Sequence, residues 1–180
     1  MIYVFLASGF EEIEALAPVD CLRRAGYDVK IVGVGAEAIR GSHDIVVGAD
    51  LTADEILLDD SLEMIVLPGG MPGTLNLEAS AQVQKAISFC IEHDKFIGAI
   101  CAAPSILGHL GLLDGKNATC YAGFETQLGS ANATGAPVEV AGKIITARGA
   151  GVAVEFALTL VGCLKGETAQ QKMTEALMCR

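Results

Sequence analysis

The sequence predicts an α/β fold, a three-layer sandwich in which helices cover both faces of a mostly parallel sheet. Short apolar runs alternate with helix-like segments along the chain, an order that favours parallel strands joined by crossover helices. The strand-like runs are apolar at nearly every position, as expected of strands buried on both faces. Because 52% of the 180 residues are hydrophobic, we expect a single domain over residues 1–180 with a sizeable core.

The N-terminal part contains three expected strands and one helix. Residues 2–7 ("IYVFLA") have the pattern of a buried strand, and a helix follows over residues 11–26 with Gly26 as its stop signal. Residues 28–35 predict the next strand. Residues 43–50 ("HDIVVGAD") predict an additional strand, which we expect at an edge of the sheet.

The middle of the chain repeats the alternation. Residues 62–70 ("LEMIVLPGG") predict a strand that runs into a glycine turn, and residues 80–94 have the apolar period of an amphipathic helix. Residues 95–100 predict another buried strand, and a helix is expected from about 102 to 110.

The C-terminal part closes the expected sandwich. Residues 116–123 predict a short strand plus loop, and residues 137–147 predict a small β-hairpin because a glycine and polar residues separate two β-prone runs. Residues 151–166 and 168–179 predict two helices. The chain contains no internal repeat, low-complexity tract or long linker.

Charge and hydropathy exclude several classes of function. The formal net charge of −10 disfavours binding to nucleic acid, whose phosphates require clustered Lys and Arg. No apolar run approaches ~18 uncharged residues, so we expect no membrane span. The chain opens on the strand-like "MIYVFLA", so we expect no signal peptide and a cytoplasmic location.

The cysteines show neither a CxxC pair nor a Cys/His spacing suited to zinc. Nucleotide-binding patterns such as GxGxxG are also absent, so we expect no metal and no cofactor. Most of these thiols are expected to fill the core. The six cysteines of the chain are Cys21, Cys90, Cys101, Cys120, Cys163 and Cys179.

Cys101 stands out because the strand-like "FIGAI" ends at it and "AAPS" follows at once. A residue at such a strand-to-helix elbow often has strained backbone angles and projects away from the sheet. The start of the next helix would favour the thiolate form. Two interpretations remain open on spacing alone, a buried core thiol and a nucleophile.

Glu14 is the best candidate for a proton partner of such a thiol. At about 100° per residue, it lies at the margin of an apolar helix stripe, where partial desolvation raises a carboxyl pKa and lets it share a proton with sulfur. The stripe consists of Ile13, Leu16, Ala17 and Cys21. Alternatively, Glu11, Glu12 and Glu14 are all helix N-terminal acids that match the dipole.

A glycine turn and the histidine positions complete the pattern. Gly69 and Gly70 follow a strand, where backbone N–H groups can turn toward a bound oxygen and form an oxyanion hole. The histidines, His43, His93 and His109, do not lie just after a strand on the expected site edge. We therefore favour a carboxylate–thiol pair over a Cys–His dyad.

Four segments together resemble the DJ-1/ThiJ/PfpI superfamily, and its parkinsonism-associated DJ-1 branch in particular. They are "SGFEEIEALAPVDCLRRAG" at the first loop and helix, "VLPGG" at the oxyanion turn, "AICAAP" at the nucleophile elbow and "ITARGAGVAVEFAL" near the C-terminus. The matches run from residue 1 to about residue 166 in the family's order. The resemblance implies a flavodoxin-like, class I glutamine amidotransferase-like sandwich that forms a homodimer through its first helix.

The resemblance also implies the roles of individual residues. Cys101 would be the reactive, oxidisable cysteine and Glu14 its protonated carboxyl partner, while Gly69, Gly70 and the amide of Ala102 would bind an oxyanion. Tyr121 and Arg148 would be accessory residues. The activities implied are cofactor-free glyoxalase chemistry on methylglyoxal, deglycation of early adducts, peroxide sensing and chaperone behaviour.

The chain departs from the family pattern in two places. Several relatives carry a histidine in the loop after the next strand. Here that loop reads "TCYAGFE", with Tyr121 near that position, and its phenol is a poor base near pH 7. Ala102 follows Cys101 where the protease-like branch has a histidine, which argues against proteolysis.

These observations lead to three hypotheses. The leading one is a glyoxalase- or deglycase-type enzyme in which the Cys101 thiolate attacks a small carbonyl metabolite or glycated adduct and Glu14 shuttles protons. The second is a non-enzymatic oxidative-stress sensor in which Cys101 oxidises to a sulfinate. The third is a chaperone-like dimer with a vestigial pocket.

Overall fold

A seven-stranded sheet forms the centre of the molecule, with the strand order β10-β11-β7-β6-β1-β2-β5. The computed structural model describes residues 1–179. All neighbouring strands are parallel except β10 and β11, which form the expected hairpin. The strands are β1 (Ile2–Leu6), β2 (Val29–Gly33), β5 (Leu51–Thr52), β6 (Met64–Leu67), β7 (Phe96–Ile100), β10 (Val138–Ala141) and β11 (Ile144–Ala147).

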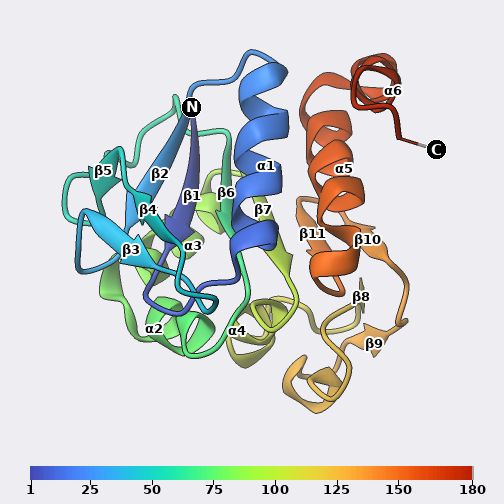
Figure 1. Cartoon of the computed structure of the whole chain (residues 1–180). Coiled ribbons are helices and arrows are strands. Elements are labelled where there is room, and N and C mark those ends of the chain that lie inside the picture. Colours follow the sequence, from blue (N-terminus) through green and yellow to red (C-terminus); the bar gives the residue numbers. More distant parts are fainter. Residues whose placement is uncertain (180) are drawn as a thin grey trace.

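Helices cover both faces of this sheet, so the predicted α/β sandwich is confirmed (Figure 1). On one face lie α2 (Gly73–Ala79), α3 (Ala81–Glu92) and α4 (Pro104–His109); on the other lie α1 (Glu12–Arg24) and α5 (Ala153–Lys165). The last helix, α6 (Glu167–Ala176), packs on α5. Within residues 1–179, no helix combines the length and the apolar character needed to cross a membrane.

The strands of this mostly parallel sheet are buried on both sides, because the helices that connect them cover both faces. All residues of β1 and β6 are buried, which explains their continuous apolar pattern. The chain runs in β1 and β7 toward the lower side of Figure 1. The turns that follow β1, β6, β7 and β11 therefore converge at one edge, where open α/β sheets form their sites.

The strand predicted over residues 43–50 does not join the main sheet. The chain instead forms a separate antiparallel pair, β3 (Ala38–Arg40) with β4 (Val46–Gly48), and β5 takes the edge position. The turn between β3 and β4 closes through a hydrogen bond from Gly41 N–H to the Ile45 carbonyl. A second small pair joins β8 (Asn117–Ala118) and β9 (Asn132–Ala133), and two 3-10 turns are η1 (Glu125–Gln127) and η2 (Ala150–Val152).

The orientation of α1 differs from the sequence expectation. Ile13 is 57% exposed and Leu16 is 36% exposed, while Glu14 is 1% exposed and Glu12 is 4% exposed. Glu14 is therefore fully buried and does not lie at the margin of a buried stripe. The rule that apolar residues face the core fails here because local N–H and O–H donors satisfy both carboxylates.

Candidate functional site

Cys101 occupies a strained elbow directly after β7. Its φ angle is +65°, in the left-handed region that residues with a side chain seldom adopt. Neighbouring segments hold this backbone in place, because Cys101 N–H donates to the Ala147 carbonyl at 2.8 Å and Tyr121 N–H donates to the Cys101 carbonyl at 2.8 Å. The predicted elbow is thus present, and the thiol is half-buried.

Glu14 reaches this thiol from the first turn of α1. Its Oε2 accepts a hydrogen bond from Gly69 N–H at 3.0 Å, and its carboxyl group also hydrogen-bonds the backbone of Ala150 and the thiol of Cys101. The side chain of Glu11 caps the helix by accepting from Glu14 N–H at 2.7 Å. Three segments far apart in sequence therefore fix the carboxyl beside the sulfur.

Gly69 packs closely against both Cys101 and Glu14, and only glycine fits there. A Cβ at this position would lie 2.6 Å from Cys101 Cβ and 2.6 Å from Glu14 Oε2. The Gly69 amide, expected to bind an oxyanion, instead donates to Glu14. The backbone groups of Gly70 and Ala102 hydrogen-bond the sulfur and lower the pKa of Cys101, so these two of the three expected donors lie at the nucleophile candidate.

Burial sets the protonation of the pair. Burial, reinforced by the charge of Glu14, raises the pKa of Cys101 to about 12, and burial raises the pKa of Glu14 to about 7. The two groups titrate as one unit because ionisation of either disfavours ionisation of the other. Above pH 7 the pair thus carries one negative charge and retains one shared proton.

The expected lowering of the Cys101 pKa by the next helix is wrong. Helix α4 has six residues and begins at Pro104, so its dipole is small. Burial and the neighbouring carboxylate outweigh it. The thiol is therefore protonated at rest, with the Glu14 carboxylate positioned to remove its proton.

A hollow of about 550 Å³ opens beside this pair, lined by residues that include Tyr121, Glu125, Arg148 and Gly149. A Cβ on Gly149 would lie 3.5 Å from Tyr121 Cδ2 and 3.9 Å from Glu14 Oε1. Gly149 therefore marks the place where the hollow meets the Cys101–Glu14 pair. Both accessory candidates, Tyr121 and Arg148, lie on its wall.

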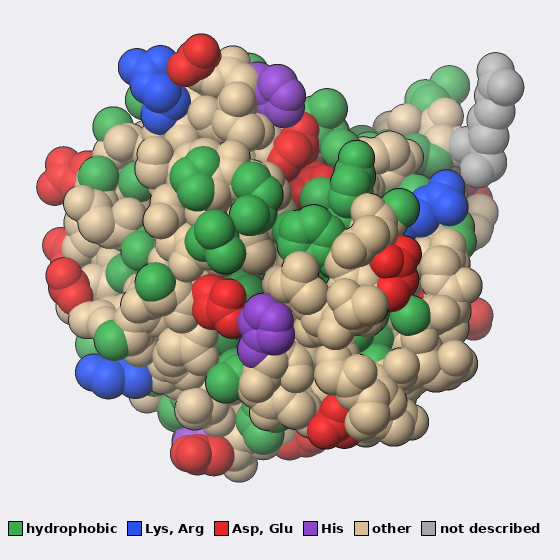
Figure 2. All heavy atoms as spheres, turned by 90° about the horizontal axis from the view of Figure 1, so that it is seen from below, with side chains coloured by type: hydrophobic (Ala, Val, Ile, Leu, Met, Phe, Trp, Pro, Cys, Tyr) green, Lys and Arg blue, Asp and Glu red, His purple; other side chains and the backbone are tan. Residues whose placement is uncertain are grey.

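The face at the carboxyl ends of the strands is poor in positive charge. Figure 2 views the molecule from this side: hydrophobic side chains gather across its middle, and Lys and Arg side chains stand toward its edges. Arg148 is thus an unusual feature beside the hollow.

The three histidines lie elsewhere. His43 Nδ1 is 3.0 Å from Glu12 Oε2, His109 Nδ1 is 2.6 Å from Glu78 Oε1, and His93 ends α3 with its ring stacked on Phe89. None of them has a hydrogen bond to Cys101 or Glu14 among residues 1–179. The preference for a carboxylate–thiol pair agrees with this geometry.

One further cluster has the composition of a cation site. Ligand atoms of Glu11, Glu12 and His43 lie within 4.8 Å of one another. Glu12, however, accepts from His43 N–H at 2.8 Å and from Ser42 Oγ at 3.3 Å, and Glu11 caps α1. These carboxylates are already used to hold the β3–β4 turn on α1.

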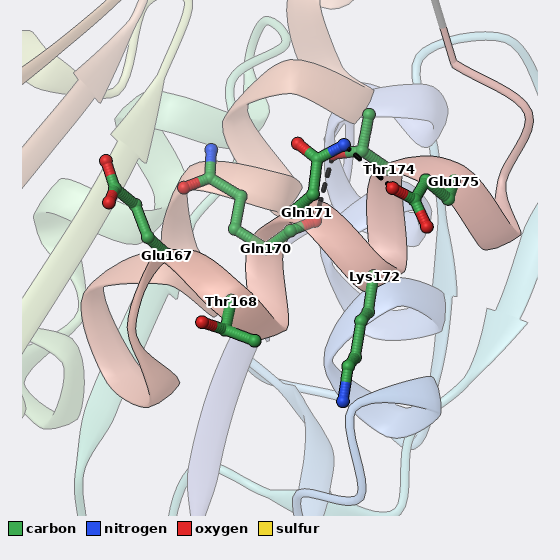
Figure 3. Close-up of a pocket in the computed structure, with 7 residues that line it drawn as sticks. All are labelled: Glu167, Thr168, Gln170, Gln171, Lys172, Thr174 and Glu175. Atoms are coloured by element: carbon green, nitrogen blue, oxygen red, sulfur yellow. Dashed lines mark hydrogen bonds between the residues drawn. The ribbon is translucent and has the colours of Figure 1, made fainter.

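A larger hollow, of about 690 Å³, lies along α6. Figure 3 shows that all seven lining side chains come from this one helix and spread in different directions without converging. Its lining contains no cysteine and no buried ionisable group. The smaller hollow beside Cys101 is therefore the better candidate for a reaction site.

Sequence reasoning missed the contribution of Ala150 and Glu125. The Ala150 backbone bonds Glu14, and the Glu125 side chain lines the hollow. The glycine-rich "ARGAG" after β11 signals a site loop, but no sequence pattern specifies which of its amides meets a carboxylate. Glu125 lies in a loop without a recognisable motif.

Comparison with known proteins adds family relationships to this geometry. The sequence profile described as the DJ-1/PfpI family matches residues 1–162. Protein DJ-1 homolog B of Arabidopsis thaliana is 36% identical over 97% of this chain, which spans 40% of that relative's length.

Two other matches bear on structure and chemistry. A solved structure of Toxoplasma gondii DJ-1 in oxidised form superimposes with a TM-score of 0.93 at 33% identity, covering 99% of this chain and 97% of the other. A Caenorhabditis elegans protein named glutathione-independent glyoxalase DJR-1.2 is 30% identical over 87% of this chain and 83% of its own length.

Proposed function

Because the chain belongs to the DJ-1/PfpI family, we propose that it is a cofactor-free, cysteine-dependent enzyme acting on reactive α-oxoaldehydes such as methylglyoxal, or on their adducts. One observation carries the proposal: a thiol at a strained elbow is hydrogen-bonded to a fully buried carboxyl group. The similarity to a named glutathione-independent glyoxalase supports it.

The first step follows from the protonation of the pair. As the Cys101 sulfur forms a bond to the aldehyde carbon, the Glu14 carboxylate accepts the thiol proton. The electron pair of the C=O bond moves to oxygen, and the backbone N–H groups of Gly70 and Ala102 stabilise this oxyanion. Proton return from Glu14 to that oxygen completes a hemithioacetal.

In the second step, the Glu14 carboxylate acts as a base toward a C–H bond of the hemithioacetal. Glu14 removes the proton of the former aldehyde carbon, and the electron pair of that C–H bond forms an enediol as the neighbouring keto oxygen gains a proton. Glu14 then returns the proton to the neighbouring carbon, and loss of the hemithioacetal hydroxyl proton leaves a thioester carbonyl beside a secondary alcohol. Water then hydrolyses the thioester, releasing lactate and restoring the thiol. The pKa of about 7 suits Glu14 to accept and return protons near neutral pH.

Replacement of Cys101 tests the mechanism directly. Cys101→Ser and Cys101→Ala should abolish lactate formation from methylglyoxal, because Cys101 is the thiol that lies beside Glu14. Cys120 also lines the hollow, but it is buried and burial raises its pKa to about 11. Arg24→Gln, at the opposite end of α1 from Glu14, is a matched surface control and should retain the wild-type rate. Unchanged lactate formation by Cys101→Ala would exclude the mechanism.

Peroxide sensing is a second candidate, favoured by the donors around the sulfur. The backbone groups of Gly70 and Ala102, with a protonated Glu14, would stabilise a Cys101 sulfinate. A solved relative is an oxidised form. Two equivalents of hydrogen peroxide would each transfer one oxygen to sulfur and leave water, so intact mass should rise by two oxygens at Cys101. Sensing is preferred if this occurs in a protein without lactate-forming activity.

We also propose that two copies associate through the outer face of α1 and that the protein acts in the cytoplasm. The exposed side chains Ile13 and Leu16 support the first proposal, because large apolar groups side by side on a helix favour a partner. The six unpaired cysteines support the second. We expect no nucleic-acid partner, in view of the net charge of −10.

A further inference from the structure

We propose that the hollow beside Cys101 selects carbonyl substrates that carry a carboxylate group, with the Arg148 guanidinium as the anchor and the Tyr121 hydroxyl as a second donor. The inference rests on the proposed chemistry at Cys101 and names its substrate class. That class is an adduct between an α-oxoaldehyde and a small carboxylate-bearing molecule, such as an amino-acid derivative.

Backbone geometry places the segments that carry the two donors next to the segment that carries the nucleophile. In the parallel pair β11–β7, Ala147 lies opposite Ile100, so Arg148 and Cys101 are the next residues on strands ~4.8 Å apart. Cys101 N–H bonds the carbonyl of Ala147, and Tyr121 N–H bonds the carbonyl of Cys101. Arg148 and Tyr121 are thus held next to Cys101 by its own backbone.

Both side chains line the hollow and have free hydrogen-bonding groups. Within residues 1–179, the Arg148 guanidinium has no ion pair, whereas Arg23, Arg24 and Arg40 each pair with an aspartate. The Tyr121 side chain is 53% exposed. A guanidinium has the fork geometry that matches a carboxylate with two parallel hydrogen bonds.

The acid on the same wall does not neutralise this cation. The Glu125 carboxylate accepts from Gly123 N–H at 2.8 Å and forms no ion pair with Arg148. In a chain with 22 acidic and 12 basic residues, an arginine left unpaired beside the reaction site is free to bind an incoming anion.

The size of the hollow also exceeds what a three-carbon aldehyde requires. Its volume of about 550 Å³ is far above the ~10–15 Å³ that a single water requires on the same measure. Methylglyoxal would fill a small part of this space. An adduct would place the carbon from the aldehyde at Cys101, and its second part, the carboxylate-bearing molecule, along Tyr121 and Arg148. A carboxylate on that second part would add binding energy through its contact with Arg148.

Two alkylating probes of equal length test the inference without requiring turnover. Bromoacetylglycine carries a carboxylate, and bromoacetylglycinamide carries a neutral amide in its place; in both, the sulfur displaces bromide from the same carbon. Rates are measured at Cys101 by peptide mass spectrometry, with Cys101→Ser as background. We expect the carboxylate probe to react about fivefold faster in the wild-type protein, the effect of about 1 kcal/mol for one partly exposed ion pair.

Two variants then show whether Arg148 causes the preference for the carboxylate probe. Arg148→Gln should bring the ratio of the two rates to about one, and Arg24→Gln, which removes one positive charge elsewhere, should keep the wild-type ratio. The overall charge of −10 repels anions, so a preference for the carboxylate probe requires a local cation. Equal rates in the wild-type protein, or a preference that persists in Arg148→Gln, would overturn the proposal. Lactate formation from methylglyoxal, measured in the same preparations, reports separately on the proposed function.

Discussion

The fold keeps the carboxyl group of Glu14 out of water. In an unfolded chain this group would be ionised at neutral pH. The group is 1% exposed, and burial raises its pKa from 4.5 to about 7. Backbone N–H groups and the Cys101 thiol supply its hydrogen bonds, so the carboxylate is tolerated but remains less stable than it would be in solvent. Burial of Glu14 therefore determines both its capacity to exchange protons near neutral pH and the pH dependence of folding stability.

Glu14 should make folding stability fall between pH 5.5 and pH 8. In this interval the unfolded chain has lost the Glu14 proton while the fold retains it until about pH 7, so stability decreases as pH rises. The decrease contributed by this group is about 2 kcal/mol, and Glu14→Gln should lack it. Urea unfolding of both proteins at pH 5.5 and pH 8 measures the difference.

Other titrating groups act equally in both proteins and cancel in this comparison. The lower pH stays above the isoelectric point of about 4.6, where solubility is lowest. Equal pH slopes for wild type and Glu14→Gln would show that the carboxyl is not held protonated by burial.

Individual site residues were predictable where their chemistry is local. Cys101 follows from an apolar strand that ends in small residues, and Glu14 from its place in the first helix of the family pattern. The Ala150 amide and the hollow were not predictable, because they depend on how the turn after β11 packs against α1 and on the loop that carries Tyr121. The thiol pKa was also misjudged, since burial depends on tertiary packing.

Among the elements, the turn after β6 determines how closely α1 and the Cys101 elbow approach. Gly69 lies between Cys101 Cβ and Glu14 Oε2 and donates its N–H to that carboxyl group. A turn with any side chain at this position would force α1 and β7 apart. Helix α1, the turn after β6 and the elbow after β7 therefore meet at Gly69.

Gly69→Ala should lower the rate of lactate formation by about 100-fold, because a displacement of ~1 Å between reacting groups has an effect of this size. It should also destabilise the fold by about 1–3 kcal/mol through overpacking. Gly48→Ala is the matched control, since a Cβ there meets nothing within 4 Å. Turnover assays and urea unfolding test both effects; a fully active Gly69→Ala protein would contradict the close approach.

Elements with strong periodicity were predictable, and those set by long-range contacts were not. The buried strands and α3 follow from their apolar patterns, whereas α2 has seven residues that begin at Gly73 and gives no helical period. Residues 43–50 have the composition of a sheet strand but pair with β3 instead. The buried face of α1 was misassigned because its acids face inward and Ile13 faces outward.

For the whole molecule, the misassigned face of α1 becomes a surface available to a second copy. One side of the helix presents Glu14 to the site, and another presents Ile13 and Leu16 to solvent. Ile45 and Val46, at the β3–β4 turn that Glu12 holds, are 53% and 51% exposed. Burying such groups favours association by about 25 cal/mol per Å² of apolar surface.

Leu16→Glu should convert a dimer into a monomer, because it places a charge in the middle of the proposed contact. Size-exclusion chromatography with light scattering gives the mass of each protein. Ile91→Glu, which alters a 43% exposed apolar residue on α3, should leave the dimer intact. A wild-type protein that is monomeric, or a Leu16→Glu protein that remains dimeric, would exclude this interface.

The positive φ angle of Cys101 has a consequence for how this molecule can change over time. A side chain in that conformation costs about 1–3 kcal/mol, a sizeable share of the 5–15 kcal/mol that stabilises a typical domain. Glycine would relieve this strain, although it would also lose the packing of the sulfur against the core and the stiffer backbone of a residue with a side chain. The backbone at this position therefore favours glycine, and a chemical use of the thiol is a reason to carry a cysteine there at that cost.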